Sequence, residues 1–463
     1  MPKKEYRYKM LVYPNITKKY NEIHKDSYIV LIPSLLKAIS SIAKDVHITI
    51  LNPIYIDEFD RRSKTKSKTK IYPNVKQIIY NQRFASNNNK MRTSFFFDGG
   101  VFMDVLDFTK NDYDIVYSHL PEHTLQLSNL LHNQTHSFPK FIGYSHWFET
   151  DNTADKKMLL QNYIGILEMD ECGVNSQWLK DKVLRDAKKT FNDKTIQKLE
   201  QKIQVHQLGI DDYDLSKVQH KDKKTIVFNH RGQSYMGWSF FCDAMDRLWE
   251  KRKDFKVITT QKDANASKYK WAENQSPLDV DRETYFKILK KSYIGVGCFT
   301  GYSGGGSWSI SVTDGLSLGV PFVLPKAMVY PQMVGENYPL FYKWKDEDSF
   351  VEMVDDVLGN LKLYKKAQKH IEPIIKKMKW LPSVKKWMDW NKFFEPESFP
   401  MVKSETDAYM RIMKIIKKHK LVSKAQIIGE MKWGVSRKFG KYRNRLRLDK
   451  RIKFYEHHYE WIG

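Results

Sequence analysis

A glycine-rich stretch in the second half of the chain combines the residue types that bind a phosphate group. It follows a predicted strand over residues 293–299 and precedes a predicted helix over residues 307–318. The free N–H groups and positive dipole at the amino end of such a helix attract an anion, and glycines let it approach closely. Asp314 lies about two turns into the helix, on a face that can look back at the ligand. The residues of the stretch are Gly304, Gly305, Gly306 and Ser307.

Two cations in the same half of the chain could neutralise this ligand. A tight bend alone would account for the glycines, but Arg231 follows a predicted strand over residues 225–228. A guanidinium at that place is well shaped for the oxygens of a diphosphate. Lys326 follows the buried strand that is predicted to start at Pro321 and could supply a second phosphate contact. The nearby triplet Asp-Val-Asp, which ends at Asp281, has two carboxylates that could bind a metal ion. Asp281 precedes a predicted helix and is better explained as its N-cap, so the sequence predicts no metal site.

These segments resemble the donor domain of GT-B glycosyltransferases. The run Gly315 to Leu324, GLSLGVPFVL, resembles the family segment in which an acidic residue precedes A-x-x-x-G-x-P-V-V. The resemblance implies that Asp314 contacts the ribose of a sugar nucleotide, with UDP-glucose as the expected donor. Arg231 matches the Arg of the family's G-R-x-x-x-x-K-G element, whereas Met236 replaces its Lys. Gly306 stands where many retaining members have a second Glu.

The first half of the sequence predicts a doubly wound sheet of its own, with polar residues after several of the strands. Strands are predicted at residues 8–13, 47–51, 114–119 and 141–145, with a helix over residues 27–44. Ligands of open α/β sheets bind at the carboxyl ends of the strands, which makes the polar residues there candidates for acid–base chemistry. Most of them are expected to be structural. The candidates are His24, His119, Glu122, His146 and Glu149.

His146 is the favoured candidate because of a further resemblance. The segment Phe141 to His146, FIGYSH, is similar to the strand and acid–base segment of the phage enzymes that glucosylate hydroxymethylcytosine in DNA. This resemblance implies that His146 assists the acceptor hydroxyl. Asp98, which precedes two glycines, is a second candidate for catalysis, although a turn explains an Asp there equally well.

Composition sets the outer limits. The 463 residues carry a formal net charge of +24, which favours a polyanionic partner such as nucleic acid or an anionic membrane surface. No apolar run is long enough to span a membrane, and the amino end lacks a signal-peptide core. Three cysteines in apolar contexts read as reduced core residues. We therefore expect a cytoplasmic protein, in the host cytoplasm if a phage encodes it.

The last 63 residues hold 17 Lys and Arg against 6 Asp and Glu, a composition typical of nucleic-acid binding. Predicted caps and turns give a helix, a short helix, a basic helix and an alternating segment from Arg451 to Trp461. This outline is similar to a winged helix-turn-helix domain. The alternative is a basic tail that lies on anionic lipid. The basic positions are Arg437, Lys438, Lys441, Arg443, Arg445 and Arg447.

A second basic run, residues 61–70, is predicted to be a loop. It contains Lys64, Lys66 and Lys68 among serines and threonines, and a solvated insertion is the plainer explanation. In so basic a protein it could instead contact a phosphate backbone.

The sequence thus predicts an α/β protein of GT-B architecture: two Rossmann-like domains facing a cleft and a small basic carboxyl-terminal domain. The predicted segments are an acceptor domain (1–212), a donor domain (213–380), a crossover helix and linker (381–398) and the basic module (399–463). The favoured function is transfer of glucose to 5-hydroxymethylcytosine in double-stranded phage DNA. One alternative is a peripheral transferase of lipid-linked or cell-wall glycans. A second is a DNA-binding protein on a degenerate scaffold.

Overall fold

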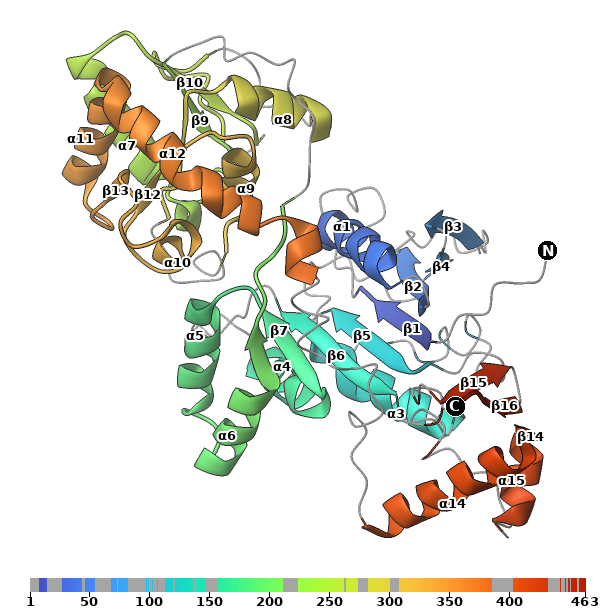
Figure 1. Ribbon diagram of the computed structural model, residues 1–463. Coiled ribbons are helices and arrows are strands. Elements are labelled where there is room, and N and C mark those ends of the chain that lie inside the picture. Colours follow the sequence, from blue (N-terminus) through green and yellow to red (C-terminus); the bar gives the residue numbers. More distant parts are fainter. Residues whose placement is uncertain are drawn as a thin grey trace.

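Three sheets, each with its own helices, follow one another along the chain in the computed structural model (Figure 1). Statements about structure below concern the described residues. These are 8–14, 27–43, 46–54, 68–72, 74–81, 97, 99, 102, 106, 113–119, 121–135, 139–145, 156–210, 224–261, 264–273, 282–299, 308–384, 403–431, 442, 446, 449, 451–455 and 458–463.

The first sheet has eight strands in the order β3-β4-β2-β1-β5-β6-β7-β8. All neighbours are parallel except β3, which runs antiparallel to β4. The central strands are nearly continuous apolar runs because helices cover both of their faces. The strands are β1 (Tyr8–Tyr13), β2 (Val46–Ile54), β3 (Lys68–Tyr72), β4 (Val75–Asn81), β5 (Ile115–His119), β6 (Lys140–Ser145), β7 (Glu171–Val174) and β8 (Ile203–Val205).

Alternate residues of these strands feed two separate layers of core. Met10 and Val12 of β1 join the cluster under α1 (Ser27–Ile42). Leu11 and Tyr13 point to the other face, as the two-residue period of a strand requires. That second face is covered by α3 (Thr124–Thr135), α4 (Lys156–Glu168), α5 (Gln177–Ala187) and α6 (Asp193–Lys202).

The second sheet has five parallel strands in the order β10-β9-β11-β12-β13. The chain passes from β9 to β10 in one direction and from β10 through β11 to β12 in the other, so right-handed crossovers place α7 on the face opposite α8 and α9. Its strands are β9 (Thr225–Phe228), β10 (Lys256–Thr259), β11 (Ile294–Val296), β12 (Phe322–Pro325) and β13 (Phe341–Tyr342). Its helices are α7 (Trp238–Lys251), α8 (Arg282–Lys291), α9 (Ile310–Ser317), α10 (Tyr330–Val334), α11 (Glu347–Gly359) and α12 (Leu361–Lys377).

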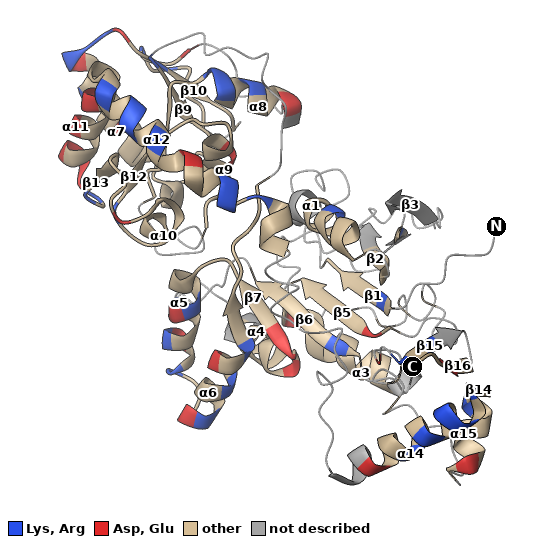
Figure 2. Cartoon of the chain, in the orientation of Figure 1, with Lys and Arg blue, Asp and Glu red and all other residues tan. Residues whose placement is uncertain are grey.

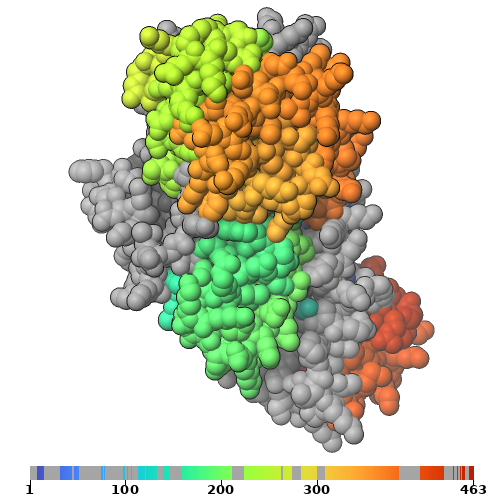
Figure 3. All heavy atoms as spheres, turned by 90° about the vertical axis from the view of Figure 1, so that its left-hand side faces the viewer, coloured from blue at the N-terminus to red at the C-terminus, as the bar shows by residue number. Residues whose placement is uncertain are grey.

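Two chain segments join the lobes that these sheets form. The outgoing segment at residues 206–210 pairs with the returning segment at 378–384, where the Ile210 N–H donates to the Met378 carbonyl (2.7 Å). The Ser383 hydroxyl donates to the Gln207 carbonyl at 2.6 Å. A Cβ on Gly209 would lie 2.3 Å from the Trp380 ring, so a larger residue does not fit there. Figure 3 shows the second lobe (yellow-green and orange) stacked on the first.

The carboxyl-terminal residues form a third unit with its own core, which includes Tyr409, Ile412, Val422, Leu446 and Tyr459. Its three-stranded antiparallel sheet has the order β14-β16-β15. In Figures 1 and 3 this unit lies at the end of the molecule away from the second lobe. Its elements are α14 (Lys403–His419), β14 (Leu421–Ser423), α15 (Lys424–Glu430), β15 (Ile452–Tyr455) and β16 (His458–Trp461), with helical residues Tyr442 and Leu446 before β15.

The α/β class, the two parallel sheets and several predicted elements are confirmed. The predicted strand at 8–13 and the predicted capping box at Ser423 and Gln426 are present as expected. The prediction of a loop over residues 61–70 is wrong at its end, because Lys68 begins β3 and pairs with Ile78. Isoleucine and tyrosine in this segment favour a strand once β4 offers a partner. All three cysteines are buried and free of disulfides.

Candidate functional site

Aromatic and histidine side chains are tied together at the carboxyl ends of β1 and β5. The Tyr13 hydroxyl lies 2.8 Å from Nδ1 of His123, and the Tyr117 hydroxyl lies 2.7 Å from Nδ1 of His119. The His119 ring also stacks on Tyr144 of β6, with ring centroids 5.9 Å apart. These groups are almost wholly buried. The end of the first sheet is therefore a rigid aromatic surface.

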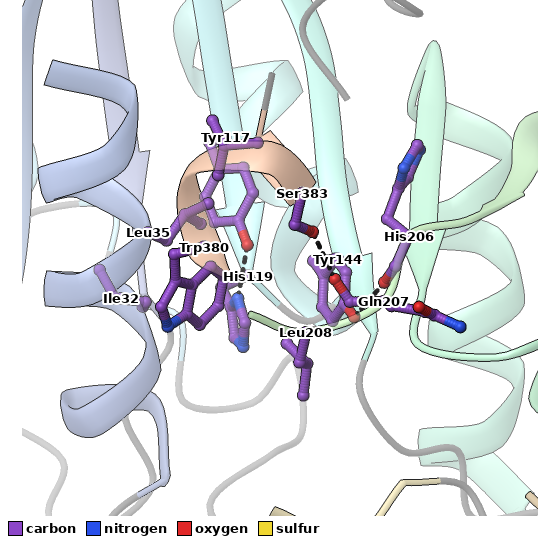
Figure 4. A pocket seen from close by; sticks show the side chains of 11 residues that line it. Ile32, Leu35, Tyr117, His119, Tyr144, His206, Gln207, Leu208, Trp380 and Ser383 are labelled. Atoms are coloured by element: carbon purple, nitrogen blue, oxygen red, sulfur yellow. Dashed lines mark hydrogen bonds between the residues drawn. The ribbon is translucent and has the colours of Figure 1, made fainter. Parts of the chain in front are cut away.

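A small pocket lies on this surface, between α1 and the returning segment (Figure 4). Trp380 and His119 face each other across it, and the Tyr144 hydroxyl donates to the His206 carbonyl at 2.7 Å. Both connecting segments contribute to the wall, so the pocket lies at the joint between the lobes. Its lining residues are Ile32, Leu35, Tyr117, His119, Tyr144, His206, Gln207, Leu208, Trp380, Ser383 and Val384.

A buried carboxyl group lies next to this joint. Burial raises the pKa of Glu171 to about 9; the nearby Lys140 opposes the shift and Asp170 adds to it. His206 Nε2 lies 3.7 Å from Glu171 Oε1, over the Cα of Gly173. With this pKa the carboxyl group is protonated at neutral pH.

The carboxyl ends of β9 and β10 carry polar residues that are buried but incompletely paired. Asn229 follows β9, and its side-chain amide donates to the Ser311 carbonyl at 2.7 Å and to the Tyr285 hydroxyl at 3.0 Å. Thr260 follows β10 and is buried as well. His230 donates to the Val296 carbonyl (3.0 Å), and burial lowers its pKa to about 4, so that it is neutral at pH 7.

Helix α9 begins at the same edge of the second sheet. Its N-cap is Ser309, whose hydroxyl accepts from the Val312 N–H at 3.2 Å. The carboxylate residue Asp314 is buried one turn further along and is only 8% exposed. A Cβ on Gly315 would lie 2.1 Å from the Phe322 ring, so this glycine lets the helix lie close to β12. The amide of Asn229, which donates to the Ser311 carbonyl, holds the first turn of α9 beside the end of β9.

The predicted site residues are divided between this edge and segments outside the described residues. Arg231 is exposed after β9, Lys326 is exposed after β12, and Asp314 lies in α9. The predicted helix start at Ser307 is corrected, since α9 begins at Ile310 after the Ser309 cap. Lys68 lies in β3, as described above. The residues outside the description are His146, Asp98, Gly304, Gly305, Gly306, Ser307, Lys64, Lys66, Arg437, Lys438, Lys441, Arg443, Arg445 and Arg447.

Three residues at this edge escaped the sequence interpretation: Asn229, Thr260 and Trp308. Each has a buried side-chain polar atom with no hydrogen-bond partner among the described residues. The available signal was a polar residue directly after an apolar strand, which occurs at Asn229 and Thr260. Nothing in the sequence distinguishes Trp308 from the other tryptophans of the core.

Several solved structures are similar to this chain. Sucrose-phosphate synthase from Thermosynechococcus elongatus has a TM-score of 0.62 at 9% identity, covering 83% of this chain and 98% of that one. A trehalose-6-phosphate structure from E. coli, bound with UDP-2-fluoro glucose, gives 0.58 at 12% identity, covering 82% and 98%. The N-terminal domain of Candida albicans trehalose-6-phosphate phosphatase gives 0.60 at 11% identity, covering 84% and 97%.

Neither the comparison with protein-family models nor the one with curated sequences gives a match. At these identities the likeness to solved structures establishes the fold alone. The chain has the GT-B fold of two Rossmann-like lobes, and about a sixth of it has no counterpart in the first of those structures. Among the described helices, none is long and apolar enough to cross a membrane.

Proposed function

We propose that this protein is a glycosyltransferase that uses a nucleotide-sugar donor, with UDP-glucose as the first candidate. The observation that carries the proposal is the carboxyl edge of the second sheet within a GT-B fold: the exposed Arg231 follows β9, the exposed Lys326 follows β12, and α9 with the buried Asp314 begins after β11. Arg231 and Lys326 would neutralise the leaving diphosphate, and Asp314 would position the ribose. One similar structure was solved with a UDP-sugar analogue, which supports the choice of nucleotide.

The proposed acceptor is a hydroxymethylated pyrimidine, 5-hydroxymethylcytosine first, in double-stranded phage DNA. The carboxyl-terminal unit supports this acceptor, because its elements follow the order α14, β14, α15, β15 and β16, with the helical residues Tyr442 and Leu446 between α15 and β15. A sheet ordered β14-β16-β15 within that sequence of elements supports the proposal of a winged-helix-like unit. Figure 2 shows Lys and Arg along α14, and the unit has an excess of basic residues in the sequence.

The catalytic roles remain predictions from the sequence. His146 directly follows β6 at the carboxyl edge of the first sheet and would activate the acceptor hydroxyl. Asp98 is the second candidate for that role. The target base would leave the duplex to reach the site, while basic residues such as Lys64, Lys66 and those of the carboxyl-terminal unit hold the phosphates.

The test is nucleoside mass spectrometry of hydroxymethylcytosine DNA after incubation with the protein and a panel of sugar nucleotides. We expect a new glycosylated nucleoside, whose mass identifies the sugar, and its loss in the Asp314→Ala variant. Unmodified cytosine DNA of the same sequence is the matched acceptor control and should give no product.

Absence of product with every donor, despite tight duplex binding, would leave a DNA-binding protein on a GT-B scaffold. Anionic vesicles provide a further arm of the same experiment. Binding to phosphatidylserine vesicles with no affinity for duplex would favour transfer to lipid-linked or cell-wall glycans instead.

A further inference from the structure

Six exposed lysines lie along one face of α12 in the second lobe. At about 100° of rotation per residue, they fall within about a third of the helix circumference, so they project from the same side. At 1.5 Å of rise per residue the row is about 22 Å long. We call these residues the α12 lysine row; they are Lys362, Lys365, Lys366, Lys369, Lys376 and Lys377.

The row is unfavourable for the helix that carries it. Lys362 lies three and four residues before Lys365 and Lys366, and Lys369 follows those two at the same spacings. Like charges at these spacings destabilise a helix. Cations near the amino end also oppose the helix dipole, and α12 has no acidic residue in its first turn. The neighbouring α11 has two acidic residues there, as the dipole favours. The charges of α12 therefore indicate a role outside the helix itself.

Most of the row has no acidic partner within the described part of the chain. Of its lysines only Lys376 forms an ion pair there, with Glu372 at 3.0 Å. Carboxylates of the adjacent α11 pair with arginines of the second lobe instead, as Asp355 does with Arg252 at 2.7 Å. The remaining ammonium groups of the row are thus open, as far as the described residues go, to an anion from outside the chain.

The partner that suits such a row is a polyanion with closely spaced charges. Duplex DNA carries one negative charge per about 1.7 Å of its axis, so a stretch as long as the row presents about a dozen phosphates. An anionic membrane suits it less well, because a helix that lies on a bilayer inserts an apolar face. The apolar face of α12 is already packed in the core of the lobe through Tyr364, Ala367 and Ile371. Leu361 is exposed, but it is a single side chain at the helix start, outside the row.

We propose that the α12 lysine row is a second binding surface for the backbone of duplex DNA, separate from the basic carboxyl-terminal unit. The inference rests on the proposed function, which names double-stranded DNA as the acceptor. Figure 2 shows lysines along both α12 and α14, which belong to units at opposite ends of the molecule. Backbone contacts carry no sequence information, so the row positions the duplex on the second lobe without selecting its sequence.

The test is the salt dependence of binding between the full-length protein and an unmodified DNA duplex. The test variant, called the row variant, has glutamine at four positions of the row. At about 0.1 M salt its affinity should fall at least tenfold, and the slope of log affinity against log salt should become shallower by about 3 to 4, since each lost phosphate contact contributes about 0.9. Without ligand it should melt slightly above the wild type, because like charges at helical spacing are removed. The substitutions are Lys362→Gln, Lys365→Gln, Lys366→Gln and Lys369→Gln.

Two controls separate the row from the overall charge of the protein. The charge-matched control replaces four exposed lysines at the end of α5 and in α6 of the first lobe by glutamine, and it should leave the salt slope nearly unchanged. Glu372→Gln acts in the opposite direction: it releases Lys376 from its ion pair and should tighten duplex binding. The control positions are Lys188, Lys189, Lys194 and Lys198.

The outcomes distinguish this inference from the proposed function. If the row variant binds the duplex with the affinity and salt slope of the wild type, the row is not a DNA surface, and the proposed transfer is unaffected. If the row variant instead loses binding to phosphatidylserine vesicles alone, the partner is a membrane and the inference is wrong. A row variant that melts below the wild type would show that the lysines stabilise the helix, which also contradicts it. If the row binds the duplex but no glycosylated nucleoside forms with any donor, the inference holds and the proposed function fails.

Discussion

The two parallel sheets differ in how they treat the polar side chains at their carboxyl ends. In the first sheet the tyrosines and histidines bond to one another, as in the pairs Tyr13–His123 and Tyr117–His119. In the second sheet Asn229 bonds its amide end to α9 and leaves its oxygen without a described partner. The first edge is thus built from aromatic and imidazole rings that bond to one another, whereas an amide joins the second edge to the helix beside it. The pairs of rings stiffen the first edge, and the hydrogen bond from Asn229 fixes the first turn of α9 at the second.

The largest expected effect concerns how much space the second lobe leaves around its glycines. Gly237 has φ 73°, and a Cβ there would lie 1.7 Å from the Cys298 carbonyl oxygen at the end of the β11 segment. Gly237→Ala should lower the free energy of unfolding by about 3 kcal/mol or more, measured by urea denaturation. Gly319 has φ 77° with nothing within 4 Å, so Gly319→Ala should cost only about 1 kcal/mol. Equal effects would show that backbone strain alone matters.

An intermediate effect concerns the first lobe and its dependence on pH. Burial raises the folded-state pKa of Glu171 from 4.5 to about 9, so the folded protein retains a proton that the unfolded chain releases. Stability from this group is full below pH 4.5 and is lost as the pH rises toward 9. Glu171→Gln removes that loss and should melt above the wild type at pH 8, with the difference shrinking toward pH 5. A constant difference across that range would contradict the raised pKa of Glu171. The titratable or charged groups that face its carboxyl group are His206, Lys140 and Asp170.

The smallest effects come from a matched pair of helix caps, one in each lobe. Ser176 caps α5 by accepting from the Leu179 N–H at 3.1 Å, and Ser309 caps α9 in the same way. Either change to Ala should reduce the free energy of unfolding by about 1 kcal/mol. Only Ser309→Ala should also weaken UDP binding, because its helix begins at the proposed ligand edge. If Ser176→Ala also weakened UDP binding, the proposal that only the second lobe binds the nucleotide would be wrong.

Much of the fold could be predicted from local patterns. The continuous apolar run at Tyr8–Tyr13 predicted a buried parallel strand, and the capping residues at Ser423 predicted a helix start. The sequence pattern predicted the wrong structure where strand pairing decides it. Lys68 belongs to a polar segment that predicts a loop, but it lies in β3 because β4 pairs with it. Arg231, Asp314 and Lys326 were also predictable as site candidates, since motif position and charge identify them.

The sequence by itself determined the α/β class and the order of its elements, and it predicts phosphate binding in its second half. These properties follow from hydrophobic periodicity, glycine spacing and charge, which act over a few neighbouring residues. Only the tertiary structure placed Asn229 beside Thr260, which lies 31 residues further along the chain, through the register of β9 and β10. It also brought Asn229 to the first turn of α9 through the hydrogen bond to Ser311. It likewise determined which polar atoms have partners, since hydrogen bonding of a buried group depends on neighbours that are distant in sequence.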